Sequence, residues 1–216
     1  MNTTKVLMIN IVVLLLLIAG GFTGYYYYNQ STLYLKTKNA QVAGQQMTIA
    51  APAAGHLKDW KGKSGTALKA GETVGDVETA GAQGTAQVNV TIPQDGTIVQ
   101  NMAVDNQMVA PGTPLAYAYD LKNLWVTANI SETDLEDVKV GQTVDVYVDA
   151  YPNITFNGTV EQIGMTTAGT FSLLPQSNSN ANYTKVTQVI PVKITLNNSQ
   201  AAGLAPGMSA EVRIHK

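Results

Sequence analysis

The residues of this chain that could do chemistry form three groups, and each group lacks a part that its chemistry requires. Gly62-Lys63-Ser64 resembles the end of a phosphate-binding loop. That motif needs a glycine five residues before its second glycine, where this chain has Leu57. His56 and His215 are the only histidines, and neither has a metal-binding spacing to another ligand. The chain has no cysteine, which removes disulfides and thiolate metal sites. We therefore expect no phosphate site and no metal site.

A group of carboxylates is the third candidate: Glu132, Asp134, Glu136 and Asp137. Paired carboxylates can perform acid–base catalysis. Ser131 precedes this group, however, and Asp134 follows it by three residues, as in a helix capping box. Acids in the first turn of a helix also stabilise it through the helix dipole. We therefore predict one short helix here and a structural role for its acids. No Gly-x-Ser-x-Gly motif is present either, so we expect no enzymatic activity.

A repeated unit must position whatever function the chain has. Its turn residues recur at an offset of 41 residues, with Pro52, Gly55 and Gly71 in one copy and Pro93, Gly96 and Gly112 in the next. Glycine permits the positive φ of tight turns and proline ends strands, so we expect turns at these positions. Units of about thirty residues rarely bury a core alone. The repeat therefore predicts that residues 49–78 and 88–119 pack together as one β-domain over residues 49–119.

The repeat resembles the two halves of a lipoyl/biotinyl-like domain. This resemblance implies either a domain with a cofactor on a lysine at the junction of the halves or a rigid module in a larger assembly. The junction, residues 78–87, has no lysine, and Lys58, Lys61 and Lys63 lie within the first half. We therefore predict no covalent cofactor. The Gly, Ala and Gln residues of the junction favour a flexible connection.

The N-terminus carries an apolar run over residues 6–23. Eighteen helical residues reach about 27 Å, close to the hydrocarbon thickness of a bilayer. Lys5 precedes the run and the next basic residue is Lys36, which favours a cytoplasmic N-terminus and an extracytoplasmic body. We predict a single-pass anchor over residues 1–28, with tyrosines at the outer interface. Its representative residues are Val6, Leu14, Leu17, Ile18, Tyr25 and Tyr26. The alternative is a cleaved signal peptide, although the apolar core of a signal peptide is shorter.

The rest of the chain predicts a second β-module. Residues 29–48 form a strand-rich segment that leads toward it, and residues 120–216 contain short alternating strands separated by Gly, Pro and Asn turns. In one of them, Val140, Val144, Val146 and Val148 share a face. Such strands suggest a small β-barrel. The net charge of −2 and the lack of a basic cluster argue against a nucleic-acid partner.

Several segments of this second region resemble the barrel of HlyD-type membrane fusion proteins, in residues 120–135, 138–144 and 156–160. Residues 171–178 and 183–194 resemble the EmrA branch of that family. The resemblance implies a membrane-anchored adaptor that works with an inner-membrane transporter in the export of drugs or toxic compounds. In that branch the transporter is of the major facilitator type, with an ABC transporter as the alternative, and family members commonly form rings. The candidate partner-contact residues are Phe171, Leu173, Leu174 and Pro175, unless this stretch only closes the barrel.

The chain departs from the family pattern at the junction of the repeat. Gram-negative members have a long coiled-coil hairpin there, whereas about ten residues join the halves here and no heptad run is present. We therefore expect export without a bridge to an outer-membrane duct. A short adaptor from a cell without an outer membrane fits this departure, as does an engineered or degenerate form. The rival functions are an exported binding protein for a small ligand or cell-wall component and, less favoured, a carrier subunit.

Overall fold

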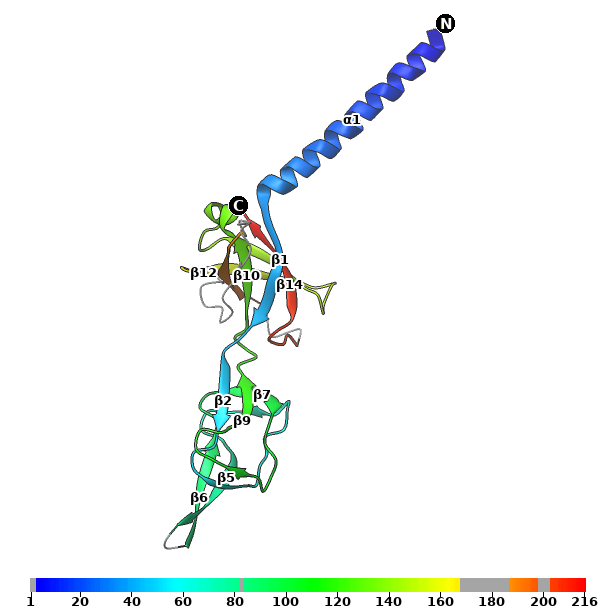
Figure 1. Ribbon diagram of the computed structural model, residues 1–216. Coiled ribbons are helices and arrows are strands. Elements are labelled where there is room, and N and C mark those ends of the chain that lie inside the picture. The colour runs from blue at the N-terminus through cyan, green and yellow to red at the C-terminus, as the bar shows by residue number, and fades with distance from the viewer. Residues whose placement is uncertain (1–2, 82–83, 168–186, 198–202) are drawn as a thin grey trace, which may run out of the picture. The chain divides into compact units, whose positions relative to one another are not determined.

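The computed structural model describes residues 3–81, 84–167, 187–197 and 203–216 (Figure 1). The chain is mainly β with one N-terminal helix, which confirms the predicted fold class. It divides into two compact units. One consists of Met1–Ala40, Thr127–Thr195 and Ala210–Lys216, and the other of Gln41–Val126 and Leu196–Ser209. We call the β-part of the first the barrel and that of the second the sandwich.

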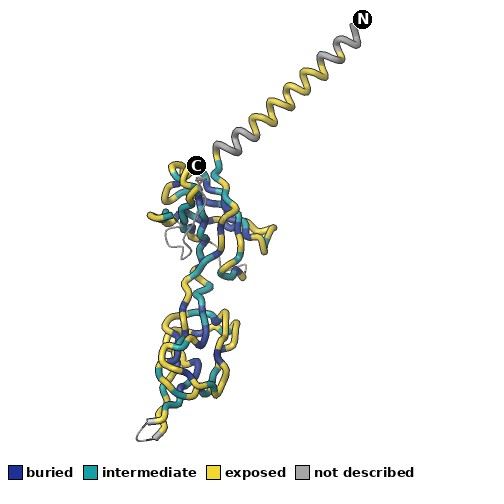
Figure 2. Tube along the Cα trace, in the orientation of Figure 1, coloured by how far each residue is buried: buried dark blue, intermediate teal, exposed yellow. Residues whose placement is uncertain are grey.

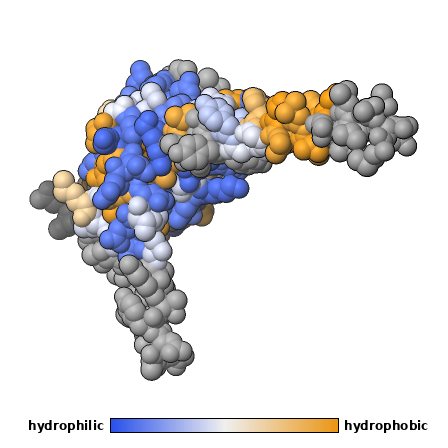
Figure 3. Space-filling model, turned by 90° about the horizontal axis from the view of Figure 1, so that it is seen from above, coloured by the Kyte–Doolittle hydropathy of each residue, from blue (hydrophilic) through white to orange (hydrophobic). Residues whose placement is uncertain are grey.

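The N-terminal helix α1 spans Thr3–Leu33. All side chains from Ile11 to Tyr26 are exposed, and the helix presents an apolar surface (Figure 3). Within the described part of the chain, no helix has both the length and the hydropathy that crossing a membrane requires. The anchor over residues 1–28 therefore stays a prediction. The helix also continues through residues 29–33, which the sequence assigned to the strand-rich segment, and the first strand begins at Tyr34.

The barrel is a closed sheet of six strands in the order β1-β10-β13-β12-β11-β14, as predicted for this region. These strands are β1 (Tyr34–Ala43), β10 (Trp125–Ser131), β11 (Thr143–Val148), β12 (Thr155–Ile163), β13 (Val189–Leu196) and β14 (Ser209–His215). Val144, Val146 and Val148 point into its core. Val140 was expected on the same face, but it is 65% exposed. The expectation was wrong because β11 begins only at Thr143, so Val140 lies before the strand, where alternation does not apply.

The predicted short helix is the 3-10 helix η1 (Glu132–Asp137). Ser131 caps it, and its hydroxyl accepts a hydrogen bond from the Thr133 backbone N–H at 3.3 Å. The cap therefore contacts the second residue of the helix and not Asp134, because the 3-10 turn is tighter than an α-turn.

The sandwich consists of two four-stranded sheets, and its core is buried between them (Figure 2). The first has the order β2 (Gln46–Ala50), β9 (Pro114–Tyr119), β7 (Gly96–Asn101), β4 (Ala67–Leu68). The second has the order β6 (Gly84–Thr91), β5 (Thr73–Gly81), β3 (Gly55–Lys58), β8 (Met108–Val109). A shift of 41 residues converts one sheet into the other, strand by strand. Each half of the repeat gives two strands to each sheet, so neither half completes a sheet alone.

The turns repeat the same symmetry. Gly71 has a φ of 78° and its N–H donates to the carbonyl of Ile92 at 2.8 Å. Gly112, 41 residues later, has a φ of 80° and its N–H donates to the carbonyl of Ala51, also at 2.8 Å. Only glycine adopts this backbone conformation without strain, so both positions depend on the missing Cβ.

Gly55 and Gly96 do not have the positive φ that the turn expectation implied. Each is instead the first residue of a strand, β3 or β7, where another chain segment approaches closely. A Cβ on Gly55 would lie 2.1 Å from the carbonyl oxygen of Glu78. Glycine is therefore required at this position by cross-strand packing. Pro52 and Pro93 are exposed in the bends that precede these two strands.

The junction of the halves is an antiparallel β-hairpin and not the predicted flexible connection. The pairing of β5 with β6 continues from Val77↔Val88 in the core to Gly81↔Gly84 at the tip. The hydroxyl of Thr79 adds a hydrogen bond to the carbonyl of Ala86 at 3.0 Å. Two residues separate the strands, the commonest hairpin connection, so the register set in the core extends to the tip.

Candidate functional site

The residues that could bind a metal lie in separate places. His56 is on β3 of the sandwich, with Nδ1 at 3.4 Å from the carbonyl oxygen of Asn106. His215 is on β14 of the barrel, with Nε2 at 2.9 Å from Oδ2 of Asp145. Among the described residues, no group of three or more His, Cys, Asp or Glu side chains could hold a metal ion.

The segment that resembles a phosphate loop has a packing role. It lies between β3 and β4 and leads into a strand, not into a helix. Gly62 is buried against the indole of Trp60, and a Cβ there would lie 2.2 Å from that ring. The ring is held in turn by a 3.0 Å hydrogen bond from its N–H to Oδ1 of Asn101. This glycine therefore makes room for a tryptophan, and phosphate binding has no support.

The carboxylates of η1 are all exposed. Two other carboxylates have perturbed pKa values. A hydrogen bond from the Asn123 amide lowers the pKa of Asp120. A hydrogen bond from the Thr195 hydroxyl at 2.6 Å, followed by one from Lys193, lowers the pKa of Glu161. A catalytic acid near neutral pH needs a pKa raised toward 7, so these hydrogen bonds suit structure and not catalysis.

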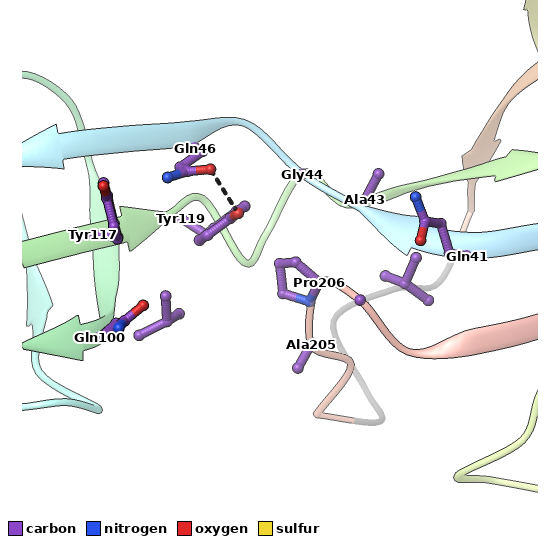
Figure 4. A pocket seen from close by; sticks show the side chains of 12 residues that line it. Gln41, Ala43, Gly44, Gln46, Gln100, Tyr117, Tyr119, Ala205 and Pro206 are labelled. Atoms are coloured by element: carbon purple, nitrogen blue, oxygen red, sulfur yellow. Dashed lines mark hydrogen bonds between the residues drawn. The ribbon is translucent and has the colours of Figure 1, made fainter. Parts of the chain in front are cut away.

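A polar hollow of about 560 Å³ lies in the sandwich unit (Figure 4). Gln46, Gln100, Tyr117 and Tyr119 contribute its polar and aromatic side chains. The hydroxyl of Tyr119 donates to Oε1 of Gln46 at 3.0 Å. The residues that line it include no carboxylate, histidine or cation, so it offers hydrogen bonds without acid–base chemistry.

A second and more apolar concavity of about 740 Å³ lies on the sheet that contains the hairpin; we call it the sandwich groove. Strand pairing puts Met108, His56 and Glu78 in one row across β8, β3 and β5. Alanines at positions 54, 80 and 110 supply much of the remaining surface. Met108 is 77% exposed, which is unusual for a large apolar side chain. Exposed apolar surface of this kind is typical of contacts with another macromolecule.

Sequence reasoning did not identify the sandwich groove. Its signal was available in Met108-Val109, because neighbouring residues of a strand face opposite ways and a buried Val109 requires an outward Met108. The predicted partner-contact residues Phe171, Leu173, Leu174 and Pro175 lie outside the described residues. On α1, the predicted anchor residues Leu14, Leu17, Ile18, Tyr25 and Tyr26 are all exposed. Val6 is also on α1, and its side chain is outside the description.

Comparison with known proteins places both β-units in one family. The YhbJ barrel-sandwich hybrid domain matches residues 45–120, and the YknX-like β-barrel domain matches residues 124–214. The putative efflux system component YhbJ of Bacillus subtilis is 48% identical over 214 residues, 99% of this chain and 94% of that protein. The multidrug export protein EmrA of Escherichia coli is 32% identical over 115 residues, 53% of this chain and 30% of that protein.

A solved structure shares the fold at low sequence identity. The membrane fusion protein Spr0693 of Streptococcus pneumoniae superposes with a TM-score of 0.57 at 13% identity, over 85% of this chain and 99% of that one. The nearly full-length match to YhbJ, together with the same pair of β-units, establishes the relationship. The chain belongs to the family of EmrA-like membrane fusion proteins.

Proposed function

We propose that this chain is the adaptor subunit of an efflux system and works with a transporter of the cytoplasmic membrane. The observation that carries the proposal is the 48% identity, over nearly the whole of both chains, with an efflux system component. The same two β-units match family domains in the same order. In this role the chain performs no chemistry and acts as a non-catalytic partner of the transporter.

Attachment to the membrane is the first part of the proposal. Residues 11–26 of α1 are exposed without interruption and include no charged side chain. Lys5 lies before them and Lys36 after them, so the N-terminus would face the cytoplasm and the β-units the outside. Arginine in place of both Leu15 and Leu16 should release the chain from washed membranes, because each arginine costs about 3 kcal/mol at the centre of a membrane helix. Membrane retention of this variant would contradict insertion of α1.

The partner is the second part. The EmrA-like relationship favours a transporter of the major facilitator type, with an ABC transporter as the alternative. The sandwich groove, with Met108 at its edge, and residues 171–175 are the candidate contact surfaces. We also propose that the adaptor associates with further copies of itself.

Export without an outer-membrane duct is the third part. The hairpin extends four residue pairs beyond Val77↔Val88. At about 3.4 Å per residue, this projection is about 14 Å long. Such a hairpin is too short to replace a coiled coil that reaches a distant duct.

The proposal is tested on the full chain in its own membranes. A tagged copy is crosslinked, purified and searched for a multi-pass transporter, and export of that transporter's substrates is then measured with and without the adaptor. A partner that depends on the adaptor for export is the expected result. Purification without any transporter, together with normal export in its absence, would contradict the proposal.

A further inference from the structure

The hairpin leaves one long strand at an open edge of the sandwich. β6 (Gly84–Thr91) is the outermost strand of its sheet and hydrogen bonds to β5 on one side. In the described part of the chain, no strand pairs with its other side. β2 comes near β6 but belongs to the other sheet. The open side of β6 is therefore free to pair with another strand.

Proteins usually protect such an edge with lysine, proline, a bulge or a very short strand. β6 has none of these, because its sequence is Gly-Thr-Ala-Gln-Val-Asn-Val-Thr and the register shift near its end adds the extra residue to β5. The other edges of the two sheets are shorter: β4 and β8 have two residues each, and β2 has five with a register shift at its end. β6 is thus the unprotected edge among the described strands of the sandwich.

The strand register identifies the backbone groups that face outward. Residue pairs of an antiparallel ladder alternate between hydrogen-bonded and non-hydrogen-bonded pairs. Gly81 and Gly84 flank the two-residue connection and form a hydrogen-bonded pair, so the alternate residues Thr85, Gln87 and Asn89 direct N–H and C=O away from β5. All three side chains are exposed.

We propose that β6 pairs antiparallel with β6 of a second copy of this chain, with Gln87 of one copy opposite Gln87 of the other. Thr85 of each copy then lies opposite Asn89 of the other, and about six backbone hydrogen bonds join the two sheets. A second copy is the favoured occupant for two reasons. β6 carries no charge, so self-pairing brings no like charges together. The contact is also self-complementary and uses the whole edge, so it closes at two copies and does not extend into a fibre.

This contact specifies the self-association proposed above, but its test does not depend on transport. The chain has no cysteine, so single-cysteine variants of the full-length protein report one position each. In a hydrogen-bonded antiparallel pair the Cα atoms lie about 5.5 Å apart, within reach of a disulfide. Gln87→Cys in detergent or nanodiscs should therefore form a covalent dimer under mild oxidation. Gln94→Cys, an exposed glutamine in the bend between β6 and β7, is the matched control and should stay monomeric.

A second pair of variants separates backbone pairing from side-chain contact. Gln87→Pro removes an outward N–H that the fold does not use, and Gln87→Ala keeps it. Gln87→Pro should raise the dissociation constant of the dimer by about tenfold or more, since several hydrogen bonds of about 1 kcal/mol each are lost. Gln87→Ala should leave it within about twofold. Circular dichroism of both variants checks that the sandwich remains folded.

The possible outcomes separate the claims. Wild-type-like association of Gln87→Pro, or crosslinking of Gln87→Cys to the transporter and not to a second copy, would overturn the proposed edge pairing. Equal losses in Gln87→Pro and Gln87→Ala would overturn it as well, because the side chain would then carry the contact. Adaptor function would be unaffected by any of these results, since loss of export on removal of the chain tests it separately.

Discussion

Alanine at two symmetry-related glycines should have very different effects, although Gly55 and Gly96 occupy equivalent positions of the repeat. A Cβ on Gly55 would lie 2.1 Å from the carbonyl oxygen and 2.8 Å from the carbonyl carbon of Glu78. These backbone atoms belong to β5, which pairs with β3 at this point. Relief of the clash requires the two strands to separate by roughly 1 Å, which an interior packed to crystal-like density resists.

The environment of Gly96 is more permissive. The closest atom to a Cβ there is Cε of Met47 at 2.4 Å, the end of a flexible side chain, and the nearest backbone atom is the Tyr119 carbonyl oxygen at 3.2 Å. Methionine adapts readily to a change in packing. We therefore expect Gly55→Ala to lower the free energy of unfolding of the sandwich by about 3 kcal/mol and Gly96→Ala by about 1 kcal/mol.

Urea unfolding of the full chain measures the difference. Trp60 lies in the sandwich, and Trp125→Phe as a common background leaves it as the single tryptophan reporter. With a slope of about 2 kcal/mol per molar urea, the two variants should differ in midpoint by about 1 M. Gly112→Ala is a control for backbone strain alone, because its φ is 80° and nothing lies within 4 Å of its Cβ. It should cost about 1 kcal/mol. Equal midpoints for Gly55→Ala and Gly96→Ala would refute the argument from the Glu78 carbonyl.

Four further predictions follow from the same features. The lowered pKa of Asp120 gives stability that is present above its unfolded-state pKa near 4 and lost as the pH falls through the folded pKa; Asp120→Asn should remove that part of the pH dependence of unfolding between about pH 2 and 5. N-terminal sequencing of membrane-derived protein should find residues 6–23 retained, and a start near residue 21 or 24 would indicate a cleaved signal peptide. Intact mass spectrometry of native protein should give the chain mass, whereas an added lipoate or biotin would disprove the rigid-module interpretation. Leu174→Asp should reduce export if residues 171–175 contact the transporter, and unchanged export would leave that stretch to close the barrel.

The repeat made the sandwich predictable because its signal is a fixed offset in the sequence. Pairs such as Gly71 and Gly112 mark the same turn in each half, and a local turn is encoded by its own residues. The barrel was predictable from the alternation of buried residues such as Val144 and Val146, which reports strand faces directly.

The errors arose where one segment depends on another that is distant in sequence. Gly55 was assigned to a turn because nothing near it in sequence shows that the Glu78 carbonyl fills the space of its Cβ. The junction of the halves was expected to be flexible from its small residues, but pairing begun at Val77↔Val88 continues through it. The sandwich groove was missed for the same reason, because it is formed by strands from both halves.

The rate of drug efflux tests the central claim most directly. Export of a fluorescent substrate of the co-purified transporter is followed in cells with the adaptor, without it, and with the wild-type chain restored. The account predicts slower efflux without the chain and recovery when it returns, with no requirement for an outer-membrane duct. Efflux at the normal rate in cells that lack the chain would contradict its role as an adaptor.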